Sequence, residues 1–247
     1  MSTTSVEPAT PTSYVPSRRT VLRAAAWTAP AVSVAVAVPA YAACSPASTK
    51  PSPYTVDWGS KVYTRSSAAS GVAVVPGGVV GAQPVDIVLT SSVSSSRVER
   101  TAANLLGSKL GLELHHASPI RAGRDYRQTV TFTFSRPVSD LAFSITDIDS
   151  SDGGWWDQVE LSGQRKFTAQ PRGRRNSYVV GSGVPGNPWH YHDGNTVLPN
   201  AGDSRGTVAV VYNEAVSSIS LVYWSSVGGS NQRIWLSDFT FTASSCA

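Results

Sequence analysis

Four aspartates in the short segment 147–157 are the side chains of this 247-residue chain best suited to chemistry. Asp147, Asp149, Asp152 and Asp157 fall within eleven residues, and two glycines between them permit a tight bend. Carboxylates this dense repel one another unless a positive charge lies among them, and Ca²⁺ takes about six to eight oxygen ligands. The glutamate that ends an EF-hand loop is missing, because Gln158 stands at that position. We therefore expect either a calcium site at the four aspartates or an acidic turn whose side chains cap backbone amides.

Aromatic residues accompany the acidic segment. Trp155 and Trp156 lie inside it, and Trp189 and Tyr191 lie in a second loop between two prolines. Flat aromatic faces pack against the apolar C–H patches of sugar rings, so these four are the predicted ligand-binding residues. Successive residues of a strand face opposite ways, so one of the paired tryptophans would point into the core. The alternative is that all four aromatic side chains fill the ends of the fold.

The four histidines fall in two pairs, His115-His116 and His190-x-His192. On a strand, the His-x-His spacing places both imidazoles on one side, where Asp193 would add an oxygen ligand for zinc. Two such pairs also arise by chance, and no His-Glu-x-x-His motif accompanies them.

Catalytic motifs are absent from the sequence. It contains neither a Gly-x-Ser-x-Gly nucleophile elbow nor a glycine-rich phosphate loop. A carboxylate pair for glycoside hydrolysis, drawn from Asp147, Asp149, Asp157 and Glu160, would depend on distances in space. No catalytic residue is therefore assigned, and whether the protein is an enzyme stays open.

Arginines near the start of the chain indicate export. Arg18 and Arg19 precede a moderately apolar segment, 24–42, which two prolines interrupt. Basic residues, a short apolar segment and small residues before a cleavage site are the parts of an export signal, and the paired arginines resemble the twin-arginine (Tat) type. A membrane span needs about 20 strongly apolar residues. We expect cleavage after Ala42, a secreted, extracellular protein, and no transmembrane segment in the mature chain.

The two cysteines, Cys44 and Cys246, lie near the two ends of the mature chain. An even number of cysteines in an exported protein indicates a disulfide. This one would join the termini if the first and last strands are neighbours. Lipid attachment at Cys44 is the alternative, although Tyr41 stands where a lipoprotein signal usually has an aliphatic residue.

Charge argues against nucleic acid as a partner. Losing residues 1–42 removes three arginines and one glutamate, so the net charge falls from +4 to about +2. A nucleic-acid-binding protein needs a strong basic stripe. One basic cluster stands out within 165–175, and it would contact anionic polymers or form a solvated hairpin tip. Its members are Arg165, Lys166, Arg172, Arg174 and Arg175.

Alternating hydrophobic residues indicate strands. Val130, Phe132 and Phe134 alternate with polar residues, residues 135–140 have turn chemistry, and the alternation resumes over 141–145. This pattern predicts a hairpin. Further strands are expected at 84–89, 158–161, 178–180, 207–212, 218–224, 233–236 and 239–242, the last two forming one strand with a bulge.

These patterns predict an all-β protein with a single antiparallel β-sandwich or jelly-roll-like domain over residues 54–247. A signal peptide at 1–42 and a flexible, alanine-, serine- and proline-containing lead at 43–53 would precede it.

Segments 131–138 and 141–149, together with Ser237-Asp238-Phe239-Thr240-Phe241, resemble modules of secreted actinobacterial surface proteins. The resemblance covers about two thirds of the mature chain. Those modules are mostly uncharacterised jelly-roll-like domains, so the resemblance implies a fold and an extracellular location, and no activity or site.

The leading hypothesis is a secreted module that binds polysaccharide or cell-wall glycan. Trp155, Trp156, Trp189 and Tyr191 would contact the sugar, and calcium would make the acidic loop rigid. A secreted glycan-cleaving hydrolase that uses the loop carboxylates and a purely structural surface or matrix protein are the alternatives.

Overall fold

The computed structural model describes residues 51–118, 122–163, 166–172, 178–198 and 200–244, which all belong to one unit, Tyr41–Ala247. Two short 3₁₀ helices occur among them, η2 (Arg124–Tyr126) and η3 (Ser204–Gly206). The strands are β1 (Pro51–Val56), β2 (Tyr63–Ser67), β3 (Ser70–Val75), β4 (Val85–Val93), β5 (Glu99–Arg100), β6 (Leu106–Ser108), β7 (Gly111–Ser118), β8 (Gln128–Thr146), β9 (Ser150–Ser151), β10 (Trp155–Ser162), β11 (Thr168–Pro171), β12 (Val179–Val180), β13 (His190–Tyr191), β14 (Val208–Tyr212), β15 (Val216–Ser225), β16 (Gly229–Leu236) and β17 (Phe239–Ser244).

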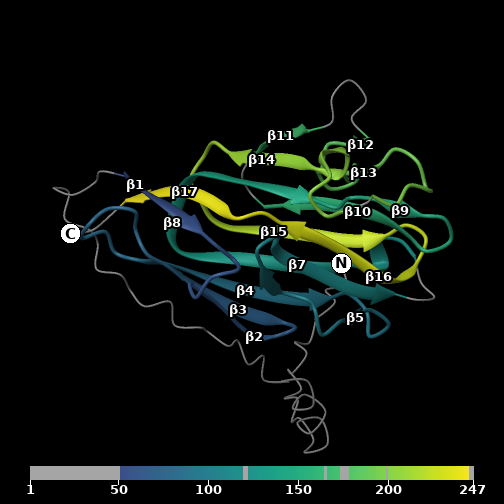
Figure 1. Ribbon diagram of the computed structural model, residues 1–247, viewed down its shortest axis with the longest axis horizontal. Coiled ribbons are helices and arrows are strands. Elements are labelled where there is room, and N and C mark those ends of the chain that lie inside the picture. Colours follow the sequence, from purple (N-terminus) through teal and green to yellow (C-terminus); the bar gives the residue numbers. More distant parts are fainter. Residues whose placement is uncertain (1–50, 119–121, 164–165, 173–177, 199, 245–247) are drawn as a thin grey trace, which may run out of the picture. The chain divides into compact units, whose positions relative to one another are not determined.

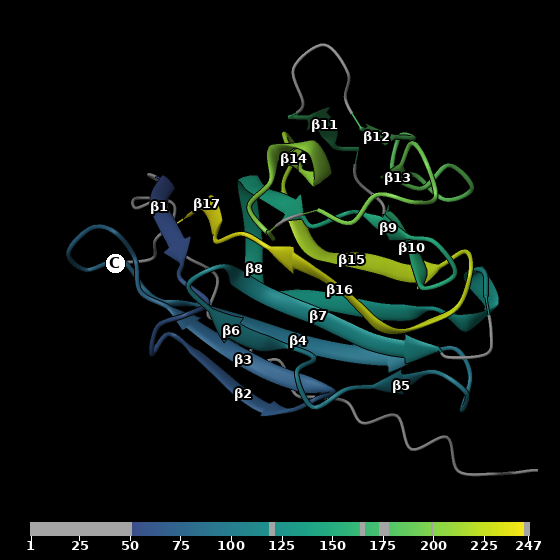
Figure 2. The same ribbon diagram turned by 45° about the vertical axis from the view of Figure 1, so that its right-hand side comes forward.

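The protein is an antiparallel β-sandwich, as the sequence predicts. One layer has the order β2-β3-β4-β8-β15-β10-β9. The other contains β1, β17, β14, β11, β16 and β7, with β5 and β6 paired to β7. In both views, β2, β3 and β4 lie side by side at the bottom, and β11 to β14 lie at the top (Figures 1 and 2).

The predicted hairpin is wrong, because β8 is one strand of 19 residues that belongs to both layers. Its first half pairs with β4 and β15, and its second half pairs with β14, β16 and β17. The buried positions change parity between Val138 and Leu141, and Asp140 between them has a φ of 54°. This irregularity bends the strand from one layer to the other. In sequence, a bend between two alternating segments cannot be told from a turn.

Aromatic side chains from both layers form the core. Phe132 of β8 lies 5.2 Å from Phe239 of β17, measured between ring centroids, and Trp58 packs edge-on against Phe239 at 5.0 Å. All three are buried. The inward-facing residues of alternating strands therefore meet between the layers, which is the arrangement that removes most apolar surface from water.

The first and last described strands are neighbours. β1 pairs with β17 from Pro51↔Ser244 to Val56↔Phe239, and alternate residues of β1 are buried. Residues 51–53 therefore belong to the fold, not to a flexible lead. The signal segment, Cys44 and Cys246 lie outside the described residues, so cleavage and the disulfide stay predictions.

Other sequence-based strands agree with the structure. The segments expected at 84–89, 158–161, 178–180, 207–212 and 218–224 overlap β4, β10, β12, β14 and β15. β16 and β17 both pair with β8 and are interrupted at Ser237 and Asp238, where a bulge is expected. The sequence patterns do not predict β1, β2, β3, β5, β6, β7, β9, β11 and β13, several of which are only two to four residues long.

Candidate functional site

The acidic segment and the second aromatic loop lie together. Trp156 donates from Nε1 to the Tyr191 carbonyl at 2.9 Å, and Ser150 donates from Oγ to the Asp193 carbonyl at 2.8 Å. The Thr196 backbone N–H donates in turn to Ser150 Oγ at 3.0 Å. These bonds join two loops that are about forty residues apart in the chain. Folding therefore brings the two predicted aromatic pairs into one region.

Within that region, the four predicted aromatics do not share one open face. Trp189 and Tyr191 are 1% and 0% exposed, and Tyr191 stacks on Tyr178 with ring centroids 5.5 Å apart. Trp155 and Trp156 are half-buried, and the N–H of each indole is bonded internally. Two separate hollows adjoin these residues, and Trp189 lines one while Trp155 lines the other.

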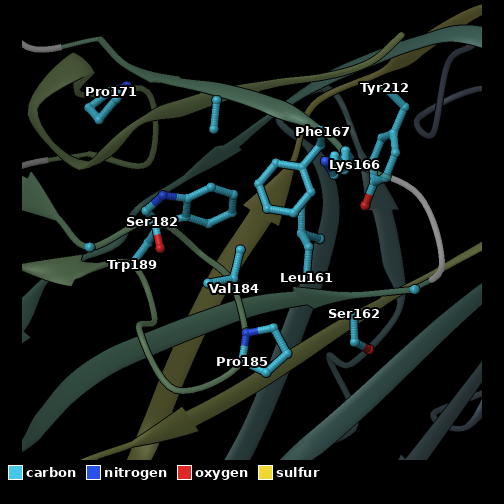
Figure 3. A pocket seen from close by; sticks show the side chains of 13 residues that line it. Leu161, Ser162, Lys166, Phe167, Pro171, Ser182, Val184, Pro185, Trp189 and Tyr212 are labelled. Atoms are coloured by element: carbon cyan, nitrogen blue, oxygen red, sulfur yellow. The ribbon is translucent and has the colours of Figure 1, made fainter. Parts of the chain in front are cut away.

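The first, which we call the aromatic hollow, has a volume of about 560 Å³. The Phe167 ring lies between the rings of Trp189 and Tyr212, at centroid distances of 5.6 and 5.7 Å (Figure 3). Phe167 is half-buried, whereas the two flanking rings are buried. The other lining residues are Leu161, Ser162, Gly163, Lys166, Ala169, Pro171, Gly181, Ser182, Val184 and Pro185.

One wall of the aromatic hollow is a loop laid along the free edge of β10. Trp189 exchanges two backbone hydrogen bonds with Val159, at 2.8 and 2.9 Å, and the Leu161 N–H donates to the Gly183 carbonyl at 2.8 Å. Gly183 has a φ of +71°, and a Cβ atom there would overlap the Trp189 indole. Glycine is therefore required at this position, because it permits both the backbone conformation and the close approach.

A buried carboxylate anchors the same loop. Glu160 is 0% exposed; its Oε1 accepts from the Gly186 N–H at 2.7 Å and its Oε2 accepts from Arg124 Nε at 2.8 Å. Both oxygens are thus occupied by structural partners. The sequence offers Glu160 as a candidate for a hydrolytic carboxylate pair. In the structure, its two hydrogen bonds position the wall of the hollow.

Polar groups are few in the aromatic hollow. The hydroxyls of Ser162 and Ser182, the amine of Lys166 and the indole N–H of Trp189 are the side-chain polar groups there besides the Tyr212 phenol. Burial raises the pKa of Tyr212, so its phenol stays protonated. Sequence reasoning missed Phe167 and Tyr212, because each is a single aromatic residue in a segment without an aromatic pattern.

The second, which we call the acidic hollow, has a volume of about 120 Å³. Asp149 accepts from Trp155 Nε1 at 2.6 Å and from the Leu198 N–H at 2.9 Å. Asp147 stands at the end of β8 in the left-handed region, with a φ of 66°. The lining residues are Asp147, Asp149, Trp155, Val197, Leu198, Asn200, Ala201, Arg233 and Trp235.

The carboxylates here have altered acidity. Burial and the nearby Asp149 charge raise the pKa of Asp147 to about 7, while Arg233 opposes the shift. Burial also raises the pKa of Asp149, against the hydrogen bond from Trp155. Beneath them, burial raises the pKa of Asp157 well above its ordinary value, although the Tyr223 hydroxyl donates to it at 2.6 Å. The protein thus holds three acidic groups where ionisation is costly.

The four aspartates predicted to bind calcium occupy different environments. Asp147 and Asp149 line the acidic hollow, Asp157 is fully buried, and Asp152 lies exposed on the turn. In the described part of the chain, no group of three or more His, Cys, Asp or Glu side chains is arranged to hold a metal ion. Calcium binding stays a prediction.

The histidines have separate partners. His115 lies 3.3 Å from Glu113, His192 lies 3.2 Å from Asp193, and His190 Nδ1 lies 3.1 Å from the Pro188 carbonyl. His116 is buried, which lowers its pKa to about 3. Of the basic cluster, Lys166 lines the aromatic hollow and Arg172 is exposed, whereas Arg165, Arg174 and Arg175 lie outside the described residues.

Comparisons with known proteins place the chain in no family. No family model matches it, and no curated protein matches it. Among solved structures, it is similar to the adhesin domain of PrgB from Enterococcus faecalis, with 13% identity, a TM-score of 0.43, and coverage of 68% of this chain and 62% of that one. It is also similar to the glucan-binding protein C of Streptococcus mutans, with 13% identity and a TM-score of 0.41. That match covers 69% of this chain and 56% of the other. Likenesses this distant do not bear on function.

Over the described residues, no helix has the length and apolar character needed to cross a membrane.

Proposed function

We propose that the protein is a secreted, extracellular binding module that holds a polysaccharide or cell-wall glycan in the aromatic hollow. The observation that carries this proposal is the Phe167 ring, half-buried between Trp189 and Tyr212 at the floor of an open hollow of about 560 Å³. Pockets that bind small ligands typically measure about 300–1,000 Å³ and combine apolar walls with a few polar groups.

The chemistry of the hollow suits a sugar. A pyranose ring has an apolar C–H face and polar hydroxyl edges, so it needs an apolar surface beside hydrogen-bonding groups. Phe167 with Val184 and Pro185 supplies the apolar surface, and the hydroxyls of Ser162 and Ser182 supply donors and acceptors. Since Phe167 is fixed by its buried neighbours, the surface is formed before the ligand arrives, which reduces the entropy lost on binding.

Location follows from the N-terminal sequence. Arg18 and Arg19, the segment 24–42 and the small residues before Cys44 support Tat-type export, with lipid attachment at Cys44 as the alternative. We place the chain with the actinobacterial surface proteins that segments 131–138 and 141–149 resemble.

The test is co-sedimentation of the purified protein with insoluble polysaccharides and bacterial cell walls. Phe167→Ala removes the accessible ring, and Leu110→Ala removes an apolar side chain that is 60% exposed outside the hollow. We expect binding by the parent and by Leu110→Ala, and a loss of about five-fold or more in Phe167→Ala, since stacking on one aromatic ring contributes at least about 1 kcal/mol.

Two further arms separate the alternatives. Loss of binding in the Trp155→Ala/Trp156→Ala double variant, but not in Phe167→Ala, would move the glycan to the predicted tryptophan pair. Release of soluble sugars during the incubation would identify a hydrolase. No binding to any matrix by the folded parent would reject the proposal and leave a structural role.

A further inference from the structure

The acidic hollow contains a carboxylate without a partner. Asp147 is 8% exposed and lines the hollow, yet among the described residues no hydrogen bond or ion pair reaches its oxygens. Its neighbour Asp149 is different, because both of its oxygens accept hydrogen bonds. Buried charges in proteins are normally paired, since an unpaired one loses its hydration without compensation.

Arg233 does not fill this role. Its guanidinium lies over the ring of Trp235 at 5.2 Å from the centroid, and it forms no ion pair with Asp147 or Asp149. It still contributes one positive charge to the lining. With two carboxylates ionised and one guanidinium present, the hollow has a net charge of about −1.

We propose that the acidic hollow is a binding site for a primary ammonium group, which would donate its hydrogen bonds to Asp147 and lie against the Trp155 indole. The site is separate from the aromatic hollow, so it goes beyond the proposed glycan binding. An ammonium has three N–H donors and one positive charge, and it is attracted to aromatic faces.

The small size of the hollow admits only a small group, and its few oxygen donors favour an ammonium over a calcium ion. A volume of about 120 Å³ holds only a few heavy atoms, since one water takes about 30 Å³. Calcium needs about six to eight oxygens, whereas the lining offers two carboxylates, one of them already hydrogen-bonded, and the Asn200 amide.

The aromatic wall adds to this selectivity. Trp155 donates its indole N–H to Asp149, so the ring is held beside the carboxylates, where it lines the hollow. A cation over a tryptophan face is attracted by the negative charge of the ring face. The hollow therefore recognises an ammonium by charge, by hydrogen bonding and by an apolar wall.

The test is a titration with defined amines, followed by calorimetry and tryptophan fluorescence. The probes are glucosamine, its neutral match N-acetylglucosamine, butylamine as an amine without a sugar, and calcium chloride. We expect glucosamine and butylamine to bind saturably at millimolar concentrations with a signal that Asp147→Asn diminishes, and N-acetylglucosamine to give no signal that depends on Asp147. Binding of glucosamine alone would identify the source of the ammonium as an amino sugar.

Variants locate the binding. Asp147→Asn keeps the shape of the side chain and should weaken amine binding by about ten-fold or more, because a hydrogen bond to a charged group contributes about 1.5–3 kcal/mol. Asp125→Asn, at an exposed aspartate in η2, is the charge-matched control and should bind as the parent does. Arg233→Gln should tighten amine binding, a gain that misfolding cannot produce.

Three outcomes would overturn the proposal: no saturable binding of either amine, equal amine binding by the parent and Asp147→Asn, or binding of calcium in place of the amines. Failure here leaves the glycan proposal intact, because that proposal depends on Phe167 and is tested with Phe167→Ala.

Discussion

The buried carboxylate of Glu160 accepts a hydrogen bond at 2.7 Å from the backbone N–H of Gly186. Through this bond a side chain of β10 holds the loop that forms one wall of the aromatic hollow. Its second oxygen faces Arg124, a residue of η2 whose side chain is partly in solvent. One carboxylate therefore connects three segments that are distant in sequence, and its loss should loosen the hollow.

Glu160→Ala should lower the free energy of unfolding by about 2 kcal/mol and weaken glycan binding. The Gly186 N–H and the Arg124 guanidinium would lose their acceptor, and a hydrogen bond to a charged group contributes about 1.5–3 kcal/mol. Urea denaturation measures the change. Glu99→Ala, at an exposed glutamate of β5, is the control. Equal midpoints for the two variants would show that the Glu160 bonds are not stabilising.

Gly183→Ala should disrupt the aromatic hollow. Alanine at a φ of +71° is strained, and its Cβ would also overlap the Trp189 ring. Gly186→Ala is the matched control, since that glycine has a φ of +88° with nothing near the added Cβ. Strain alone costs about 1–3 kcal/mol, so Gly186→Ala should be the milder change. Near-ultraviolet circular dichroism and thermal melting measure the loss of structure in each variant. Equal losses in Gly183→Ala and Gly186→Ala would mean that the Trp189 contact is unimportant.

Asp147→Asn should stabilise the protein at alkaline pH in the absence of ligand. The pKa of Asp147 is raised from 3.8 to about 7 in the folded state. Between these two pH values the folded state therefore binds more protons than the unfolded state. The stability of the folded state then falls as pH rises. The gain from Asn should be greatest above pH 7, at most about 4 kcal/mol, and should vanish toward pH 4. The other charged groups that act on Asp147 are Asp149, Arg233, Asp203 and Glu113.

Melting temperatures of parent and variant between pH 4 and pH 8 test this dependence, with Asp125→Asn as the control. A constant difference across the range would contradict it. The pKa of Asp147 also affects ligand binding, because only the ionised carboxylate attracts an ammonium. The affinity for butylamine, which stays charged over this range, should therefore rise with pH across the pKa of Asp147.

Cys44 and Cys246 should form a disulfide. β1 and β17 pair from Pro51↔Ser244, so the two described ends of the fold are adjacent. A thiol titration of the unfolded, unreduced protein should find no free thiol, and reduction should lower the melting temperature. Two titratable thiols would exclude the bond, and one would be consistent with lipid attachment at Cys44.

Local sequence was enough to predict the class of fold. Alternation such as Val130, Phe132 and Phe134 requires a strand with one buried face, and this is a property of neighbouring residues. The export signal is also a feature of a linear segment, and it stays a prediction. Of the predicted site residues, Asp147, Asp149 and Trp155 line the acidic hollow, and Trp189 lines the aromatic hollow.

Tertiary structure decided which segments meet. Nothing near residues 135–140 shows that the second half of β8 pairs with β14, β16 and β17, because partner choice depends on residues distant in the chain. For the same reason Trp189 is buried while Phe167 remains accessible. Asp147, Trp155 and Arg233 line one hollow only because β16 runs beside the end of β8. The residue types determine which secondary structure and which chemistry each segment can have. Long-range packing determines which of these residues lie together in one site.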